Sequence, residues 1–155
     1  MSMSTFNINN IELYGSGEKL LEEAFAPYIC KRLEAKYGAE WWDNAIVNVL
    51  RDNWSYVHYS YGPLPPAGRP KDDLIGSLDI RCCLTLLIFH WKDIFQDVIS
   101  PNCLTSASSL TNFIEKDLID DYDIHMALSD LAILCEQIDT STAEKMQKIR
   151  GEFEG

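Results

Sequence analysis

Arg51 and His58 have the residue types and the spacing that would suit cleavage of RNA. They are seven residues apart, which is nearly two turns of a continuous helix, so both would lie on one face. An arginine can hold a scissile phosphate while a histidine transfers a proton. Asp52 or Asn53 would be the polar member of such a site. The other interpretation, an arginine and a histidine at the end of a surface helix, is the one that the sequence favours.

An acidic run and a second histidine could suggest a metal site, but other roles explain them better. Asp117, Asp120, Asp121 and Asp123 lack the central glycine and the closing glutamate of a calcium loop. We therefore expect Asp120 or Asp121 to cap a helix. His90 is expected on the core face of a helix, as a hydrogen-bonded core residue.

The cysteines also favour a structural role. Their number is odd and no two form a C-x-x-C pair, so neither a disulfide framework nor a zinc site is expected. The sequence also contains no phosphate-binding loop, zinc-protease motif or nucleophile elbow. We expect no metal and no cofactor, and we expect buried thiols at Cys30, Cys82, Cys83, Cys103 and Cys135.

Composition and charge limit the function further. The chain has 155 residues, of which 46% are hydrophobic, enough for a packed core. Its formal net charge of −11 repels phosphates, so tight binding of nucleic acid by the chain alone is not expected. No apolar run reaches the roughly 20 residues that span a bilayer, and the polar start lacks the features of a secretory signal. We expect a cytoplasmic protein that does not enter a membrane.

The spacing of apolar residues predicts an all-α fold, a compact bundle of about five to six helices. Apolar positions recur every three or four residues. Residues 1–16 are expected to be a flexible leader and residues 17–155 a single helical domain. Gly38 should end the first helix, in which Pro27 marks a kink or a start. The structure of residues 54–61 stays open. Helices are predicted over residues 18–37, 39–53, 77–99, 104–118, 121–138 and 141–153.

Several short segments together resemble one branch of the HEPN superfamily. That branch includes a domain of an mRNA quality-control endoribonuclease and prokaryotic defence proteins. The resemblance covers most of residues 20–150. The segments that carry it are Ala24–Tyr28, Lys31–Leu33, Tyr37–Gly38 with Trp41–Trp42, Ser77–Asp79, Trp91–Phe95, Ser109–Leu110 and residues 127–134.

The resemblance implies helical bundles that usually pair, many of them metal-independent ribonucleases. In those, an arginine, a polar residue and a histidine meet across a dimer, and the motif would follow the Ser109–Leu110 helix. This sequence departs from that pattern, since it has no arginine between Arg81 and Arg150. Residues 100–139 hold eight acidic residues and one lysine. The resemblance therefore supports the fold and weakens the case for activity.

These observations lead to three alternative hypotheses for the function. The first is a catalytically degenerate HEPN-like module that forms a homodimer or binds a protein partner, in a prokaryotic defence or toxin–antitoxin system. RNA would then bind only through a partner or a dimer cleft. The second is an active endoribonuclease that uses Arg51, Asp52 and His58. The third is a nucleotide-binding helical subunit of a nucleotidyltransferase pair, for which the sequence offers no phosphate-binding motif.

Overall fold

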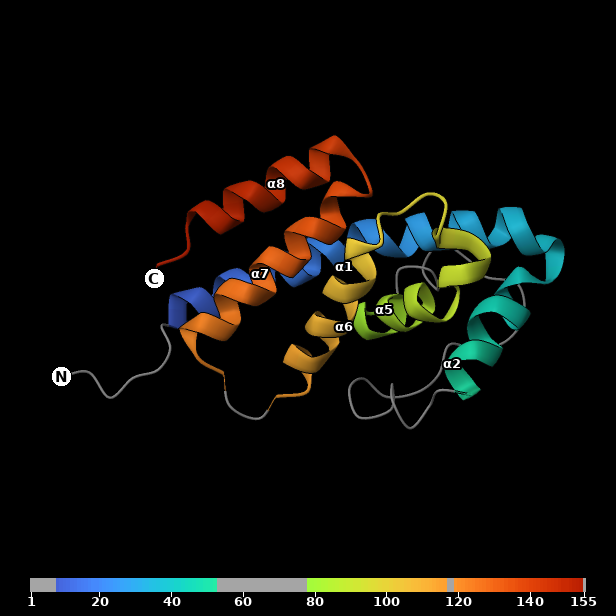
Figure 1. Ribbon diagram of the computed structural model, residues 1–155, viewed down its shortest axis with the longest axis horizontal. Helices are drawn as coiled ribbons and strands as arrows, with labels where there is room; N and C mark the ends of the chain where they lie inside the picture. Colours follow the sequence, from blue (N-terminus) through green and yellow to red (C-terminus); the bar gives the residue numbers. More distant parts are fainter. Residues whose placement is uncertain (1–7, 53–77, 117–118, 155) are drawn as a thin grey trace. The chain divides into compact units, whose positions relative to one another are not determined.

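The computed structural model describes residues 8–52, 78–116 and 119–154, and all the regular secondary structure in these ranges is helical (Figure 1). The predicted all-α class is confirmed for this part of the chain. The α-helices are α1 (Ile8–Tyr37), α2 (Asn48–Asp52), α5 (Ile80–Phe89), α6 (Asn102–Ile114), α7 (Asp121–Glu136) and α8 (Thr140–Gly151). Short 3₁₀ or π segments lie at Gly38–Glu40, Trp42–Val47 and Trp91–Phe95.

The chain divides into two compact units, and α1 contributes to both. Met1–Leu21 and Pro101–Gly155 form the α6–α8 unit, whereas Glu22–Ser100 form the α2–α5 unit. Residues 8–16 were predicted to belong to a leader, but they are the first turns of α1. The reason is that these turns pack against the other helices of the α6–α8 unit. That residues 17–155 form a single domain stays a prediction.

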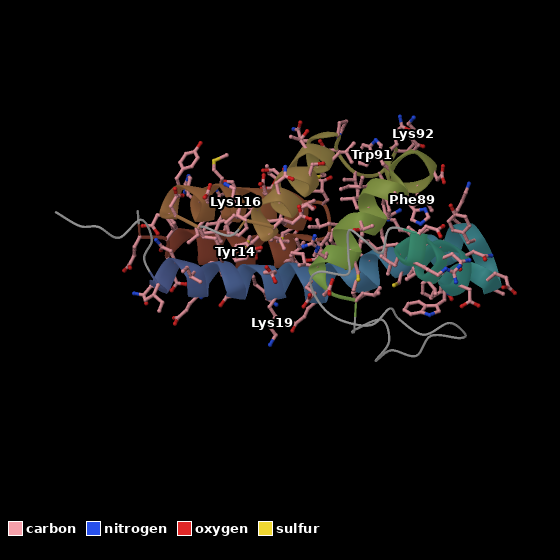
Figure 2. The ribbon with its side chains drawn as sticks, turned by 90° about the horizontal axis from the view of Figure 1, so that it is seen from below. Tyr14, Lys19, Phe89, Trp91, Lys92 and Lys116 are labelled. Carbon is pink, nitrogen blue, oxygen red and sulfur yellow. The ribbon has the colours of Figure 1, made fainter. Side chains whose placement is uncertain are left out.

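In the α6–α8 unit, α7 packs against both α6 and α8. The first half of α1 joins them through two close contacts. The rings of Tyr14 and Phe113 have centroids 4.6 Å apart. A Cβ atom at Gly17 would lie 3.0 Å from Leu131 Cδ1 and 3.3 Å from Met146 Sδ. Figure 2 shows Lys19 on the opposite side of α1 from Tyr14. Gly17 is thus a point of close helix packing, not the end of a flexible segment.

Three helices begin with an aspartate whose side chain accepts a hydrogen bond from a main-chain N–H three residues later. Asp79, Asp120 and Asp139 do this at 2.9, 2.8 and 2.7 Å. Each satisfies a donor that the first turn leaves open. The capping role predicted for Asp120 or Asp121 is confirmed at Asp120. Ser77, the predicted start of the helix over 77–99, lies outside the described residues, and α5 begins at Ile80 after its cap, Asp79. The cap of α8 is Asp139, so this helix begins one residue before the predicted Ser141.

In the α2–α5 unit, the end of α1 was predicted correctly, whereas the interiors of two predicted helices differ from the structure. Gly38 ends α1 with a φ of 70°, as expected of a glycine stop. Pro27 lies inside α1, so no helix starts there. The single helices predicted over 39–53 and 77–99 are each interrupted. After His90, the N–H of Gln96 donates to the carbonyl of Trp91, the i→i+5 bond of a π turn.

Candidate functional site

The predicted catalytic residues are only partly within the described chain. Arg51 and Asp52 are the last two residues of α2, and both are exposed. The Arg51 guanidinium donates a hydrogen bond to the side-chain oxygen of Asn48, one turn earlier. His58 lies outside the described residues. The combination of Arg51, Asp52 and His58 therefore stays a prediction.

His90 is a core histidine, as predicted. It is 2% exposed, and its Nε2 lies 2.8 Å from the carbonyl oxygen of Ala45. Burial lowers the pKa of its imidazole, and this outweighs the Ala45 hydrogen bond and the nearby Asp93 carboxylate, which raise it. The neutral ring is favoured. His90 thus links two segments of the α2–α5 unit rather than facing a site.

The acidic residues Asp120 and Asp123 stabilise the start of α7. Lys116 Nζ lies 2.7 Å from Asp123 Oδ1, and this hydrogen bond is the main reason that the pKa of Asp123 is lowered. Asp120 is used as the cap of α7. Within residues 8–52, 78–116 and 119–154, no group of three His, Cys, Asp or Glu side chains could hold a metal ion. No helix among these residues is long and apolar enough to cross a membrane.

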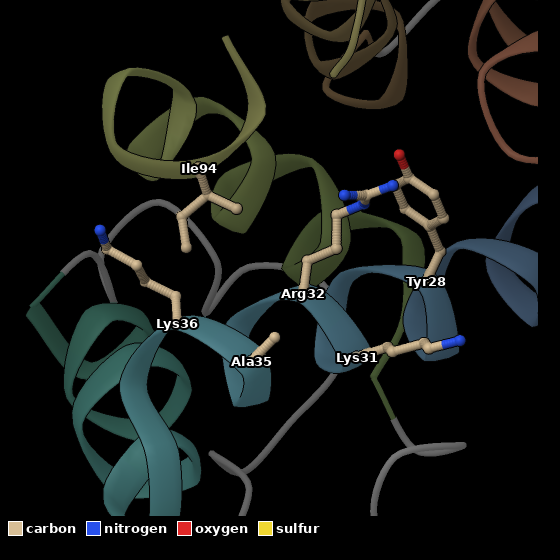
Figure 3. A pocket seen from close by; sticks show the side chains of 6 residues that line it. All are labelled: Tyr28, Lys31, Arg32, Ala35, Lys36 and Ile94. Atoms are coloured by element: carbon tan, nitrogen blue, oxygen red, sulfur yellow. The ribbon is translucent and has the colours of Figure 1, made fainter. Parts of the chain in front are cut away.

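The feature that the sequence analysis missed is a basic pocket of about 510 Å³ on the second half of α1. Figure 3 shows Arg32 and Lys36, one turn apart, on the part of α1 near Ile94 of the Trp91–Phe95 segment, whereas Lys31 points away from Ile94. Lys31 and Arg32 were used in the sequence only as part of a family resemblance, and Lys36 was not singled out there. The pocket is lined by Tyr28, Lys31, Arg32, Ala35, Lys36 and Ile94.

Arg32 is held in place within this pocket. Its guanidinium carbon lies 4.9 Å from the centroid of the Tyr28 ring, in a cation–π arrangement. Its Nε is buried and has no hydrogen bond to any described residue. No described carboxylate forms an ion pair with Lys31, Arg32 or Lys36.

A second surface lies at the start of α1 and α7, within the α6–α8 unit. The buried side chain of Asn10 donates to Asp121 Oδ1 at 3.2 Å and to the carbonyl of Glu154 at 2.7 Å. Exposed apolar side chains flank this junction. They are Ile8, Ile11, Tyr122 and Met126.

Comparison with known families matches residues 19–139 to the Swt1-like HEPN family. The match covers most of the chain and confirms the predicted resemblance to the HEPN superfamily. No curated protein and no solved structure matches the chain.

Proposed function

Because the chain belongs to the Swt1-like HEPN family, we propose that it is a helical interaction module that pairs with a second copy of itself. In this proposal the chain has lost the arginine–histidine pair of the superfamily's ribonucleases. It would serve a system of the prokaryotic defence or toxin–antitoxin type, as the resemblance implies.

The observation that carries the proposal is the exposed apolar surface at the start of α1 and α7. Tyr122 and Met126 are 70% and 43% exposed and lie one turn apart on α7. Ile8 and Ile11 are 65% and 36% exposed on the first turns of α1. The Asn10–Asp121 hydrogen bond joins the two helix starts, so these side chains lie at the same end of the α6–α8 unit. Exposed apolar side chains at one end of a unit are a candidate protein interface.

A two-fold pairing suits such a surface, because it places each apolar patch against its own copy. Carboxylates also lie at this end, among them Glu12 and Asp121. They would repel those of a second copy, and salt screens that repulsion. The pair should therefore tighten as salt is added. A basic partner protein would show the opposite dependence on salt.

Loss of catalysis is supported by the segment between α6 and α7, where the resemblance implies the ribonuclease motif. It contains no arginine. Its lysine, Lys116, already forms an ion pair with Asp123. The neighbouring carboxylates would disfavour an RNA backbone at this position.

Sedimentation of the purified protein at low and high salt tests the pairing. We expect dimers that become more stable at high salt. Replacing both Tyr122 and Met126 by glutamate should give monomers with an unchanged circular dichroism spectrum. The matched control is Val98→Glu, because Val98 is also an exposed apolar residue, 44% exposed, in the other unit. This variant should still pair. A wild-type protein that stays monomeric at both salt concentrations would overturn the proposal.

A further inference from the structure

The basic pocket on α1 is open to solvent rather than enclosed. Each of its six lining residues is exposed or half-buried, whereas a site for a small molecule buries most of the surface of its ligand. The volume of about 510 Å³ therefore suits side chains that project from a larger partner. All the lining residues belong to the α2–α5 unit, so this pocket is separate from the surface proposed for pairing.

Two cations lie on opposite sides of an apolar centre in this pocket. Figure 3 shows the Arg32 side chain extending towards Tyr28 and the Lys36 side chain extending the other way, with Ile94 between them. Ala35 adds a small exposed side chain to this centre. Cβ atoms four residues apart on a helix are about 5–6 Å apart, and the two charged groups diverge from there. A single small anion would not reach both, but two carboxylates on either side of an apolar group would.

Arg32 presents its terminal nitrogens to a partner. Its guanidinium carbon lies 4.9 Å from the centroid of the Tyr28 ring, which limits its movement and reduces the side-chain entropy lost on binding. Because Nε is buried, a carboxylate would be bound by the terminal N–H groups, in the fork geometry that suits its two oxygens.

The nearby carboxylates do not neutralise these cations. Glu34 is two residues from Arg32 and from Lys36, and residues two apart do not face each other on a helix. The Asp93 carboxylate accepts a hydrogen bond from the Tyr37 hydroxyl at 3.3 Å. The pocket is thus locally basic in a chain whose net charge is −11, and negative charge on a partner complements it.

An α-helix of a partner can supply two carboxylates with an apolar group between them. Side chains at positions i, i+3 and i+7 share one face, and the first and last are about 10.5 Å apart along the axis. We propose that the pocket binds an acidic amphipathic helix of a partner protein, in which two carboxylates seven residues apart flank one apolar side chain. The apolar side chain would contact Ala35 and Ile94, and the carboxylates would bind Arg32 and Lys36.

An RNA strand fits these observations less well. It carries a negative charge at every nucleotide, and the overall charge of the chain opposes it. Successive phosphates are also joined by a polar ribose, which does not match the apolar side chain of Ile94.

Fluorescence anisotropy with a labelled peptide tests this proposal on the whole chain. The probe is an alanine-rich helical peptide with two glutamates seven residues apart and a leucine three residues after the first. The matched peptide has the same composition, but its glutamates lie on opposite faces of the helix. The probe should bind more tightly than the matched peptide, and its affinity should fall as salt is added. Equal affinity of the two peptides would overturn the proposal, because charge alone would then explain the binding.

Variants then test the residues. Lys36→Glu replaces an attraction by a repulsion at an exposed position, so it should weaken binding of the probe about fivefold or more. Lys36→Arg should retain binding. Ala35→Gln keeps the charge but covers the apolar centre, so it should also weaken binding. The matched control is Lys148→Glu, at an exposed lysine of α8, which changes the net charge equally and should bind like the wild type.

Two further results would contradict the proposal. One is an equal affinity for the probe in folded Lys36→Glu and Lys148→Glu variants. The other is a single-stranded RNA that displaces the probe and binds more tightly than it does. That result would assign the pocket to a nucleic-acid backbone.

Discussion

The imidazole Nε2 of His90 lies 2.8 Å from the main-chain carbonyl oxygen of Ala45, in the buried part of the α2–α5 unit. A carbonyl oxygen only accepts hydrogen bonds, so Nε2 carries the proton and donates. Nδ1 is buried and has no hydrogen bond within the described part of the chain. A second proton on this ring would therefore be buried without a partner.

This arrangement predicts a pH dependence of stability. The pKa of His90 in the folded protein is lowered by burial. Below about pH 6.5 the unfolded chain binds the proton more readily, so the free energy of unfolding should fall as the pH decreases. Urea unfolding at several pH values should show a shallower decrease for His90→Gln than for the wild type between pH 7 and 5, about the range in which histidine titrates. Parallel curves for the two proteins would contradict this role.

The fully buried Asn10 should matter for stability because it joins three parts of the α6–α8 unit. Its side-chain oxygen accepts from the N–H of Glu154 at 2.9 Å, and its amide donates to Asp121 and to the Glu154 carbonyl. Asn10→Ala removes these bonds and should lower the free energy of unfolding by about 1–3 kcal/mol. Asn44→Ala, at an exposed asparagine, is the control and should change it much less. Equal effects of the two variants would argue against the Asn10 contacts.

The core prediction for α5 can be tested with two positions on the same helix. Leu87 is fully buried, whereas Phe89 is 55% exposed. A charge at Leu87 would be buried without a partner, at a cost of several kcal/mol from a total of about 5–15. Leu87→Asp should therefore be unfolded by circular dichroism, and Phe89→Asp should remain folded. A folded and soluble Leu87→Asp protein would mean that the core is assigned wrongly.

The cysteines should be unreactive in the native protein. All five are buried and free, which confirms the predicted buried thiols. Burial is the main reason that the pKa of Cys30 and of Cys135 is raised to about 12 and that of Cys103 to about 11. Since the thiolate is the reactive form, a colorimetric thiol reagent at mildly alkaline pH should label none of them until denaturant is added. Rapid labelling without denaturant would contradict their burial.

The ribonuclease hypothesis for Arg51, Asp52 and His58 has a direct test. If catalysis is lost, as we propose, the purified protein should not cleave RNA. Arg51→Ala should change the free energy of unfolding by no more than about 0.5 kcal/mol, because Arg51 is exposed. Cleavage that disappears in both Arg51→Ala and His58→Ala would overturn the proposal and support the active site.

Helix ends were predictable where a residue acts through its own backbone or its near neighbours. Gly38 takes a left-handed φ, which glycine adopts without strain. Asp120 reaches the N–H of Asp123 within one turn. The start of α8 was misplaced by one residue, at Ser141 instead of Thr140, because both Asp139 and Ser141 have side chains that can cap a helix and the sequence pattern does not rank them.

The candidate sites were less predictable, because they depend on residues far apart in the sequence. Ile94 comes to the pocket from nearly sixty residues beyond Lys36, and no pattern within α1 indicates this. The apolar surface of the α6–α8 unit likewise depends on Asn10 meeting Asp121, 111 residues later. Contacts of this kind arise only from packing.

By itself, the sequence determined the all-α class, the family, the buried cysteines and the core position of His90. These follow from the helical period of apolar residues and from short motifs, which act over one or two turns. Only the tertiary structure decided where the long helices break, that residues 8–16 are helical, and that Arg32 and Lys36 share a pocket with Ile94. The physical reason is that hydrogen bonds and side-chain packing between distant segments compete with local preference, and a sequence pattern of a few residues does not contain them.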